Sequence, residues 1–191
     1  EILNRLTEAY RKIRNTLRFL LGNLNDFDPT VDSVATENLV EIDRYILHRF
    51  ELLCEKIQKA FENYEFHVFY HSFYNFCVVD LSAFYLDILK DRLYTYPKKS
   101  AGRLSGQTAI HALLIGMVRL MAPVLSFTAE ETWSYMPPGS AEEKSVHMSS
   151  YPESLNVEVD EGFIRKWEML TELKSEVSKA LELRRQEKVI G

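Results

Sequence analysis

The chain has 191 residues, of which 46% are hydrophobic and 27% charged, and its formal net charge is −5 at pH 7. This composition excludes a disordered chain and a generally basic protein, and it is typical of one globular domain with a sizeable core. No run approaches the ~18 apolar residues of a membrane span, so we expect no membrane contact.

Residues 1–25 predict an amphipathic helix when they are placed at about 100° per residue. One face is apolar and comprises Ile2, Leu6, Ala9, Ile13, Leu17, Leu20 and Leu24. The opposite face carries Asn4, Thr7, Arg11, Arg14, Asn15 and Arg18. Five basic and two acidic residues give this segment a charge of +3, so the rest of the chain carries −8. A local positive surface on an acidic protein favours contact with a polyanion, and a solvated helix face is the alternative.

Helical spacing of apolar residues continues along the rest of the chain. The segment 67–94 is apolar nearly all round and is expected to be the central element. The expected helices are 37–63 with Thr36 as N-cap, 67–94, 101–121 weakened early by Gly102 and Gly106, a short helix that starts after Ser126 or Thr128 with a capping box over 128–131 and ends at Met136, and 161–188. The result is one all-α domain over 1–191. It is an antiparallel bundle of four long helices plus a short one, with an irregular segment near 137–160, after which the last helix, 161–188, leads toward a further C-terminal part.

The two cysteines, Cys54 and Cys77, lie far apart and within apolar helical patterns. They predict buried free thiols in a reducing compartment, which indicates a cytoplasmic protein. The chain starts without Met, already in helical pattern, and stops just after a charged helix. We therefore expect it to be a domain of a longer protein.

Two features of residues 61–94 have a functional and a structural interpretation. Ten of the 23 aromatic residues lie within 61–85, and core packing is favoured over base stacking because stacking needs exposed rings. Asp80, Asp87 and Asp91 share one face of the predicted helix. We expect buried ion pairs there in preference to an acidic metal site, because desolvated carboxylates need partners. The expected partners are Arg14, Arg44 or Arg119.

Signatures of catalysis and metal binding are missing from the sequence. None of the five histidines has a Glu three residues before it, as a di-iron bundle requires. There is no Cys-x-x-Cys or His-Glu-x-x-His zinc pattern, no Gly-rich phosphate loop and no Gly-x-Ser-x-Gly elbow. We therefore expect no catalytic residue, no metal site and no cofactor in this chain.

Several segments resemble the anticodon-binding domain of isoleucyl-tRNA synthetase, and together they span nearly the whole chain. They are YRKIRNTLRFLLGNL at 10–24 with FDP at 27–29, DRYIL at 43–47, DLSAFYLDILKDRLY at 80–94, APVLSFTAEETW at 122–133, SVH at 145–147 and ALELR at 180–184. The block at 80–94 is the one most specific to the isoleucine enzyme. The block at 122–133 resembles a looser pattern shared by the related class I enzymes.

The resemblance implies a cytoplasmic parent enzyme that joins isoleucine to its tRNA with ATP and Mg. The family's catalytic signatures His-Ile-Gly-His and Lys-Met-Ser-Lys-Ser do not occur here, so this part is expected to position tRNA without catalysing the reaction. The zinc of many bacterial members belongs to a C-terminal part that is also outside this sequence. The expected partners are the isoleucine tRNA anticodon stem-loop and the catalytic and C-terminal domains of the same chain, in a monomer.

The resemblance makes the basic face of the first helix a candidate tRNA contact. An A-form stem is held by its phosphates and 2′-hydroxyls, and Arg11, Arg14 and Arg18 recur at i, i+3 and i+7 along about 10 Å. Arginine can grip a phosphate through two N–H groups at once. We call Arg11, Lys12, Arg14, Asn15 and Arg18 the N-terminal stripe. Secondary candidates are Arg184, Arg185 and Lys188, and then Lys98, Lys99 and Arg103.

Four other interpretations are open at this level. One or two stripe arginines could pair inward with Asp80 or Asp87. The parent could be a valine-type relative, although the block at 80–94 argues against that. The chain could be a helical bundle that docks protein and has no RNA role. It could also be a helical enzyme with a carboxylate site at Asp80, Asp87 and Asp91.

Overall fold

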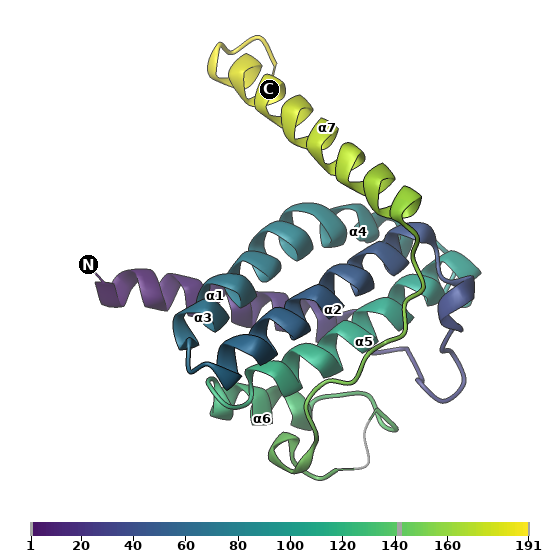
Figure 1. Ribbon diagram of the computed structural model, residues 1–191. Helices are drawn as coiled ribbons and strands as arrows, with labels where there is room; N and C mark the ends of the chain where they lie inside the picture. Colours follow the sequence, from purple (N-terminus) through teal and green to yellow (C-terminus); the bar gives the residue numbers. More distant parts are fainter. Residues whose placement is uncertain (1, 141–142, 191) are drawn as a thin grey trace. The chain divides into compact units, whose positions relative to one another are not determined.

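The computed structural model describes residues 2–140 and 143–190, and none of these residues lies in a β-strand (Figure 1). The prediction of an all-α fold is therefore confirmed. The chain divides into two compact units, residues 1–157 and 158–191, and each is described by itself.

Most of the first unit is helical, and its helices begin and end close to the predicted residues. They are α1 (Ile2–Gly22), the 3-10 turn η1 (Thr36–Asn38), α2 (Glu41–Glu62), α3 (Phe66–Asn75), the π-helix η2 (Phe76–Tyr85), α4 (Leu86–Thr95), α5 (Ala101–Met121), α6 (Ser126–Ser134) and the 3-10 turn η3 (Val146–Met148). Outside η3, the described residues between 137 and 157 are irregular, as predicted.

Both predicted helix caps are wrong. Thr36 begins η1, and α2 starts at Glu41 after an extended N-cap residue, Val40. The N-cap of α6 is Leu125, so Thr128 lies inside the helix and no capping box forms over 128–131. The Glu131 carboxylate, which would complete that box, instead accepts hydrogen bonds from a side chain on α1.

The most buried long helix is α5, which corrects the expectation that 67–94 is central. α5 packs against α2, α4, α6 and α1. By length and hydropathy, both α5 and the continuous helix Phe66–Thr95 could cross a membrane. In the fold, however, 67% of the most apolar 18-residue stretch of α5 is buried, compared with 39% of that of Phe66–Thr95. Buried core helices of soluble proteins are often as long and as apolar as these two. Two glycines bring α5 close to its neighbours. A Cβ at Gly106 would lie 2.5 Å from Leu89, and one at Gly116 would overlap the Phe50 ring.

The helix Phe66–Thr95 is continuous, but its middle third is wound as the π-helix η2 (Figure 1). Within it, the Ser82 hydroxyl donates to the Cys77 carbonyl five residues earlier, 2.7 Å away. π-Helical turns use i→i+5 hydrogen bonds and are rare, so a periodicity of 3.6 residues does not reveal them. The wider winding changes which side chains share a face.

The prediction of ion pairs to neighbouring helices holds, among the three aspartates, only for Asp80, and with a different partner. Asp80 pairs with Arg49 of α2 at 3.0 Å and not with any of the expected arginines. Burial raises the pKa of Asp80 above its usual range, although Arg49 opposes this. Asp87 is exposed beside Lys90, and Asp91 is exposed too. The three carboxylates therefore form neither a buried cluster nor a shared site.

A different buried ion pair joins α2, η2, α4 and α5. Asp43 is fully buried and accepts hydrogen bonds from the Tyr85 hydroxyl at 2.7 Å and the Ser105 hydroxyl at 2.5 Å. Its carboxylate also accepts from both terminal nitrogens of Arg92, at 2.8 and 2.5 Å. Two of the segments quoted for the family resemblance, 43–47 and 80–94, therefore meet at this network.

Eight of the ten aromatic residues at 61–85 are fully or partly buried, which favours core packing for these eight. Phe69, Phe73, Phe76 and Tyr85 are buried. The exceptions lie at the corner between α2 and α3, where Tyr64 adopts a left-handed backbone conformation (φ 59°) and Tyr64 and Phe66 are exposed. Cys54 and Cys77 are free thiols as predicted. Cys77 is buried, whereas Cys54 is only partly buried.

The second unit contains α7 (Glu161–Gln186), two residues shorter than predicted. The Asp160 carboxylate caps it by accepting a hydrogen bond from the Phe163 backbone N–H at 2.7 Å. No residue within the described helix is buried, so its apolar line is exposed at Leu170, Leu173, Val177 and Leu181.

Candidate nucleic-acid interface

The N-terminal stripe lies on the face of α1 opposite the core. Ala9, Ile13, Leu17, Leu20 and Leu24 are buried as the periodicity predicts. The first turns differ, because residues 3–8 are all exposed and α1 extends there beyond the neighbouring helices (Figure 1). Leu6 is therefore exposed although it was predicted to be buried. The burial of the middle and last turns of α1 holds the stripe in a fixed orientation.

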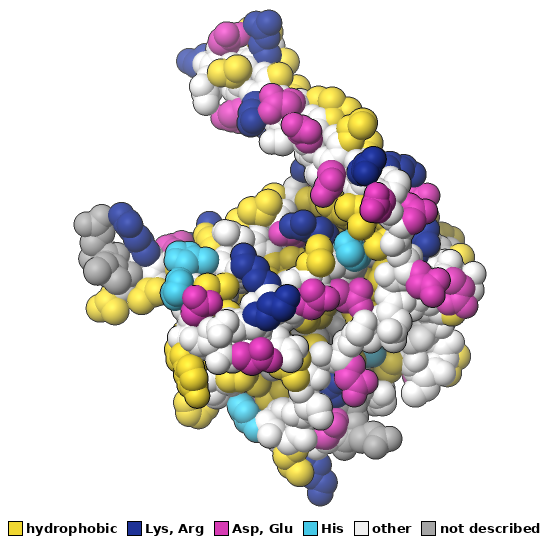
Figure 2. Space-filling model, in the orientation of Figure 1, with side chains coloured by type: hydrophobic (Ala, Val, Ile, Leu, Met, Phe, Trp, Pro, Cys, Tyr) yellow, Lys and Arg dark blue, Asp and Glu magenta, His cyan; other side chains and the backbone are white. Residues whose placement is uncertain are grey.

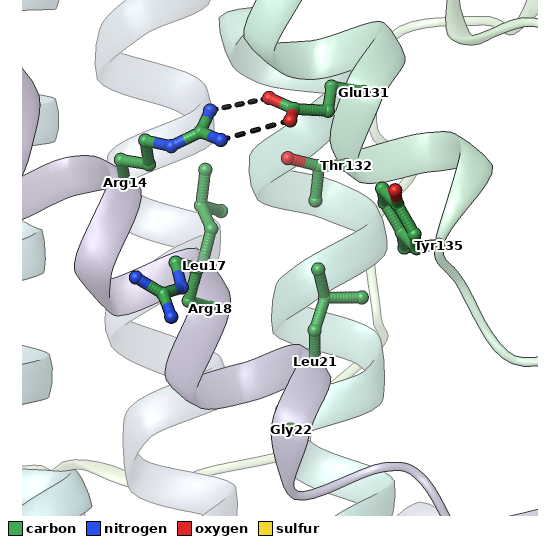
Figure 3. A pocket seen from close by; sticks show the side chains of 8 residues that line it. All are labelled: Arg14, Leu17, Arg18, Leu21, Gly22, Glu131, Thr132 and Tyr135. Carbon is green, nitrogen blue, oxygen red and sulfur yellow. Dashed lines mark hydrogen bonds and ion pairs between the residues drawn. The ribbon is translucent and has the colours of Figure 1, made fainter.

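Arg14 is anchored to α6 (Figure 3). Its two terminal nitrogens donate to the two carboxylate oxygens of Glu131, one of them at 2.9 Å. The hydrogen bonds from Arg14 hold the pKa of Glu131 below its usual range. The sequence left inward pairing of a stripe arginine open, with Asp80 or Asp87 as the partner. Arg14 does form an ion pair, but its partner is a carboxylate 117 residues away in the sequence, and the pair lies at the surface because both side chains are more than one third exposed.

Arg11 and Lys12 have weaker attachments. Arg11 pairs with Glu8 at 2.6 Å, and both side chains are more than half exposed. An exposed ion pair of this kind is worth little and exchanges readily with solvent or a ligand. The Lys12 ammonium donates to the Tyr74 hydroxyl at 3.1 Å and lies 5.6 Å from the centre of that ring.

Arg18 and Asn15 are exposed and have no partner among the residues that the structure describes. A guanidinium without a carboxylate partner retains its full charge and all its hydrogen-bond donors for a ligand. Within the stripe, Arg18 is therefore the cation most available to an anionic ligand. About one helical turn away, the Asn15 side-chain amide adds a neutral hydrogen-bond donor and acceptor.

A pocket of about 390 Å³ lies between α1 and α6 beside the stripe (Figure 3). Its lining residues are Arg14, Leu17, Arg18, Leu21, Gly22, Glu131, Thr132 and Tyr135. The Arg14–Glu131 pair closes one side, and Arg18 and Tyr135 lie toward opposite ends with Leu17 and Leu21 between them (Figure 3). Tyr135 was missed by the sequence reasoning, since nothing in its local pattern distinguishes it from a surface tyrosine.

The secondary candidates divide into different kinds of residue. Arg103 is only 9% exposed and donates to Asp26, Gln107 and two backbone carbonyls, so it is a structural residue and not a surface group. Burial opposes ionisation of Asp26, but hydrogen bonds from Arg103 and Gln107 outweigh it and lower the pKa of Asp26. Lys98 is exposed, and Lys99 binds the buried Asp32 carboxylate at 2.7 Å.

Arg184, Arg185 and Lys188 belong to the second unit and are all exposed. Arg184 pairs with Glu187 at 2.8 Å, and Arg185 lies 3.9 Å from Glu182. Lys188 follows the end of α7 in a left-handed backbone conformation.

The charge of the first unit is otherwise mixed. On the face shown in Figure 2, Lys and Arg side chains are interspersed with Asp and Glu, so no single-sign patch forms there. Across residues 2–140 and 143–190, no three His, Cys, Asp or Glu side chains gather in a way that could hold a metal ion. The arrangement on α1 offers hydrogen bonding and charge, which suits binding and positioning of an anion.

The sequence matches a protein family described as the anticodon-binding domain of tRNA ligase, over residues 43–191. The chain therefore belongs to this family. It is similar to the isoleucine–tRNA ligases of Geobacter sulfurreducens and Syntrophotalea carbinolica, each 51% identical over all 191 residues, and to that of Desulforamulus reducens, 52% identical over the same length. The chain spans about one fifth of the length of these curated relatives. The N-terminal stripe precedes the family match but lies within the region aligned with the relatives.

Proposed function

We propose that this chain holds the anticodon stem-loop of an isoleucine tRNA, as one domain of a ligase that attaches isoleucine to that tRNA with ATP and Mg. The family match and the names of its relatives support the kind of ligand. The single structural observation that carries the proposal is the solvent-facing N-terminal stripe on α1. In it, Arg18 is exposed and has no ion-pair partner within residues 2–140 and 143–190, on a chain of net charge −5.

The geometry of the stripe suits an RNA stem better than a base-reading site. The narrow major groove of an A-form helix admits no side chain, so a protein holds it through phosphates and 2′-hydroxyls. Arg11 and Arg18 are seven residues apart, about 10 Å along α1, and they bracket Asn15. Two arginines can bind separate phosphates, and the Asn15 amide can bond a 2′-hydroxyl between them.

The role of the chain in the ligase is then positioning. It carries no adenylate signature, so aminoacylation takes place in a catalytic domain elsewhere in the polypeptide, and a zinc site belongs to its C-terminal part. Partners of this chain are those two domains and the tRNA, in a monomeric cytoplasmic enzyme. In the second unit, the exposed basic residues Arg184, Arg185 and Lys188 are secondary candidates for contact with the same tRNA.

The test is a fluorescence-anisotropy titration of the chain with a labelled isoleucine anticodon hairpin at several salt concentrations. Mainly electrostatic binding predicts a dissociation constant of about 10⁻⁵ M and a steep salt dependence. Arg18→Ala should lower the slope of log K against log[salt] by about 0.7–0.9, the loss of one phosphate contact, whereas Arg18→Lys should retain it. Lys56→Ala removes an exposed charge on α2 and should leave the slope unchanged.

Glu131 provides a further test, because it neutralises Arg14. Glu131→Gln should release the Arg14 guanidinium and raise the slope, while Arg14→Ala should lower it less than Arg18→Ala does. A hairpin with a scrambled anticodon binds equally if the stripe grips only the backbone. Two results would refute the proposal and favour a protein-docking bundle. One is the absence of hairpin binding at low salt, and the other is a slope of log K against log[salt] that neither Arg11→Ala nor Arg18→Ala changes.

A further inference from the structure

The pocket between α1 and α6 has an exposed cation, Arg18, toward one end and an exposed aromatic ring, Tyr135, toward the other (Figure 3). The Tyr135 side chain is 71% exposed, and it makes no hydrogen bond or ring contact with the described part of the chain. Its backbone is nevertheless fixed, because its N–H donates to the Thr132 carbonyl at 3.1 Å at the end of α6. Two residues earlier, Trp133 is buried. Tyr135 is thus an exposed ring on a fixed backbone position, and it contributes nothing to the core.

The charge of the pocket suits an anionic ligand. Glu131 is its only lining acid, and both of its oxygens accept hydrogen bonds from Arg14. A phosphate at Arg18 therefore meets a neutralised pair and not a bare carboxylate. The floor between the two ends is apolar, at Leu17 and Leu21, and Gly22 leaves it open, since nothing lies within 4 Å of where a Cβ would stand.

We propose that this pocket receives one unpaired nucleotide of the anticodon loop, with its base stacked on Tyr135, its sugar over Leu17 and Leu21, and its phosphate bound by Arg18. The inference rests on the proposed function and deepens it, because it assigns a loop nucleotide to a site beside the stem-binding stripe. An exposed ring next to a guanidinium is the combination by which proteins hold single-stranded nucleic acid. The volume of about 390 Å³ lies within the range of small-ligand sites.

Stacking also sets what this pocket can discriminate. Every base has a π-face, so a tyrosine platform tolerates different bases and contributes affinity and loop geometry more than sequence readout. The pocket should therefore hold its nucleotide in hairpins of either anticodon sequence, provided that the loop position is unpaired.

The experiment uses the full-length ligase that contains this chain and anticodon hairpins with 2-aminopurine at one loop position at a time. The fluorescence of this base falls when it stacks on an aromatic ring. One loop position should show quenching with the wild-type enzyme and with Tyr135→Phe, and the quenching should be lost with Tyr135→Ala. Tyr135→Ala should also weaken hairpin binding at least about 5-fold. Phe127→Ala is the matched control, since Phe127 is 93% exposed on the same helix and does not line the pocket.

Three results would overturn the inference. If the hairpin binds with a salt slope that depends on Arg18 but no loop position responds to Tyr135→Ala, the pocket is not a nucleotide site and the proposed function stands. If the hairpin does not bind at low salt, both fail. If Tyr135→Ala lowers the melting temperature of the ligase while Tyr135→Phe does not, and hairpin binding is unchanged, another part of the enzyme covers the pocket.

Discussion

Replacing Asp43 by Ala should be among the most destabilising single changes in this domain. The substitution removes a fully buried carboxylate that accepts four hydrogen bonds from Tyr85, Ser105 and Arg92. The Arg92 side chain is only 11% exposed and retains one bond, to the Gly102 carbonyl at 3.1 Å. Removing one member of a buried ion pair costs about 3–5 kcal/mol because the other charge is left uncompensated.

This free energy corresponds to a fall in melting temperature of about 6–20 °C for a domain of this size. Urea unfolding followed by circular dichroism measures the loss in the free energy of unfolding. The control is a double-mutant cycle that comprises Asp43→Ala, Arg92→Met and the double variant. Because the double variant leaves no orphaned charge, it should be at least about 1 kcal/mol more stable than the sum of the single effects predicts. A cost of Asp43→Ala below about 1 kcal/mol, or strictly additive single effects, would show that the network does not couple these helices.

Three further predictions concern the core and its titrating groups. Gly116→Ala should cost about 1–3 kcal/mol in urea unfolding because its Cβ would overlap the Phe50 ring, whereas Gly22→Ala, with open space around it, should be nearly neutral. Burial lowers the pKa of His111 to about 4, so between pH 6.5 and 4 the unfolded chain binds the extra proton and stability falls as the pH falls. The loss should reach about 2–3 kcal/mol from pH 7 to 4.5 and be smaller in His111→Gln, and a parallel decline in both proteins would contradict it. Burial raises the pKa of Cys54 to about 12, so Ellman's reagent at pH 8 should label the folded chain far more slowly than the urea-unfolded chain.

Periodicity was enough to predict what each helix of the first unit does locally. The buried line of α1 follows from 3.6 residues per turn. Among its described side chains, Leu6 departs from the line because no neighbouring helix covers the first turns, and the side chain of Ile2 lies outside the described residues. The fold class, most helix ends and the outward position of Arg18 could be predicted for the same reason. These features depend on residues close together in the sequence.

The features that could not be predicted depend on partners distant in the sequence. Nothing near Arg14 indicates that Glu131 will neutralise it. The capping box expected over 128–131 does not form, since α6 begins at Ser126. The pocket needs two helices to be placed side by side before Tyr135 can be recognised. The prediction that the three aspartates share one face assumed 3.6 residues per turn through a segment that is wound as a π-helix.

The winding of η2 sets how α4 is rotated about the helix axis relative to α3 within the continuous helix Phe66–Thr95. α3 turns Phe69 and Phe73 into the core, whereas α4 must aim Arg92 at Asp43, and the wide turns between them set the angle that separates these directions. Deleting one residue from Phe76–Tyr85 would favour tighter winding and rotate α4 by about 100° about its axis relative to α3. Arg92 would then point away from its carboxylate although every contacting residue was still present. The length of this segment is therefore under as strict a constraint as the identity of the residues that form the network.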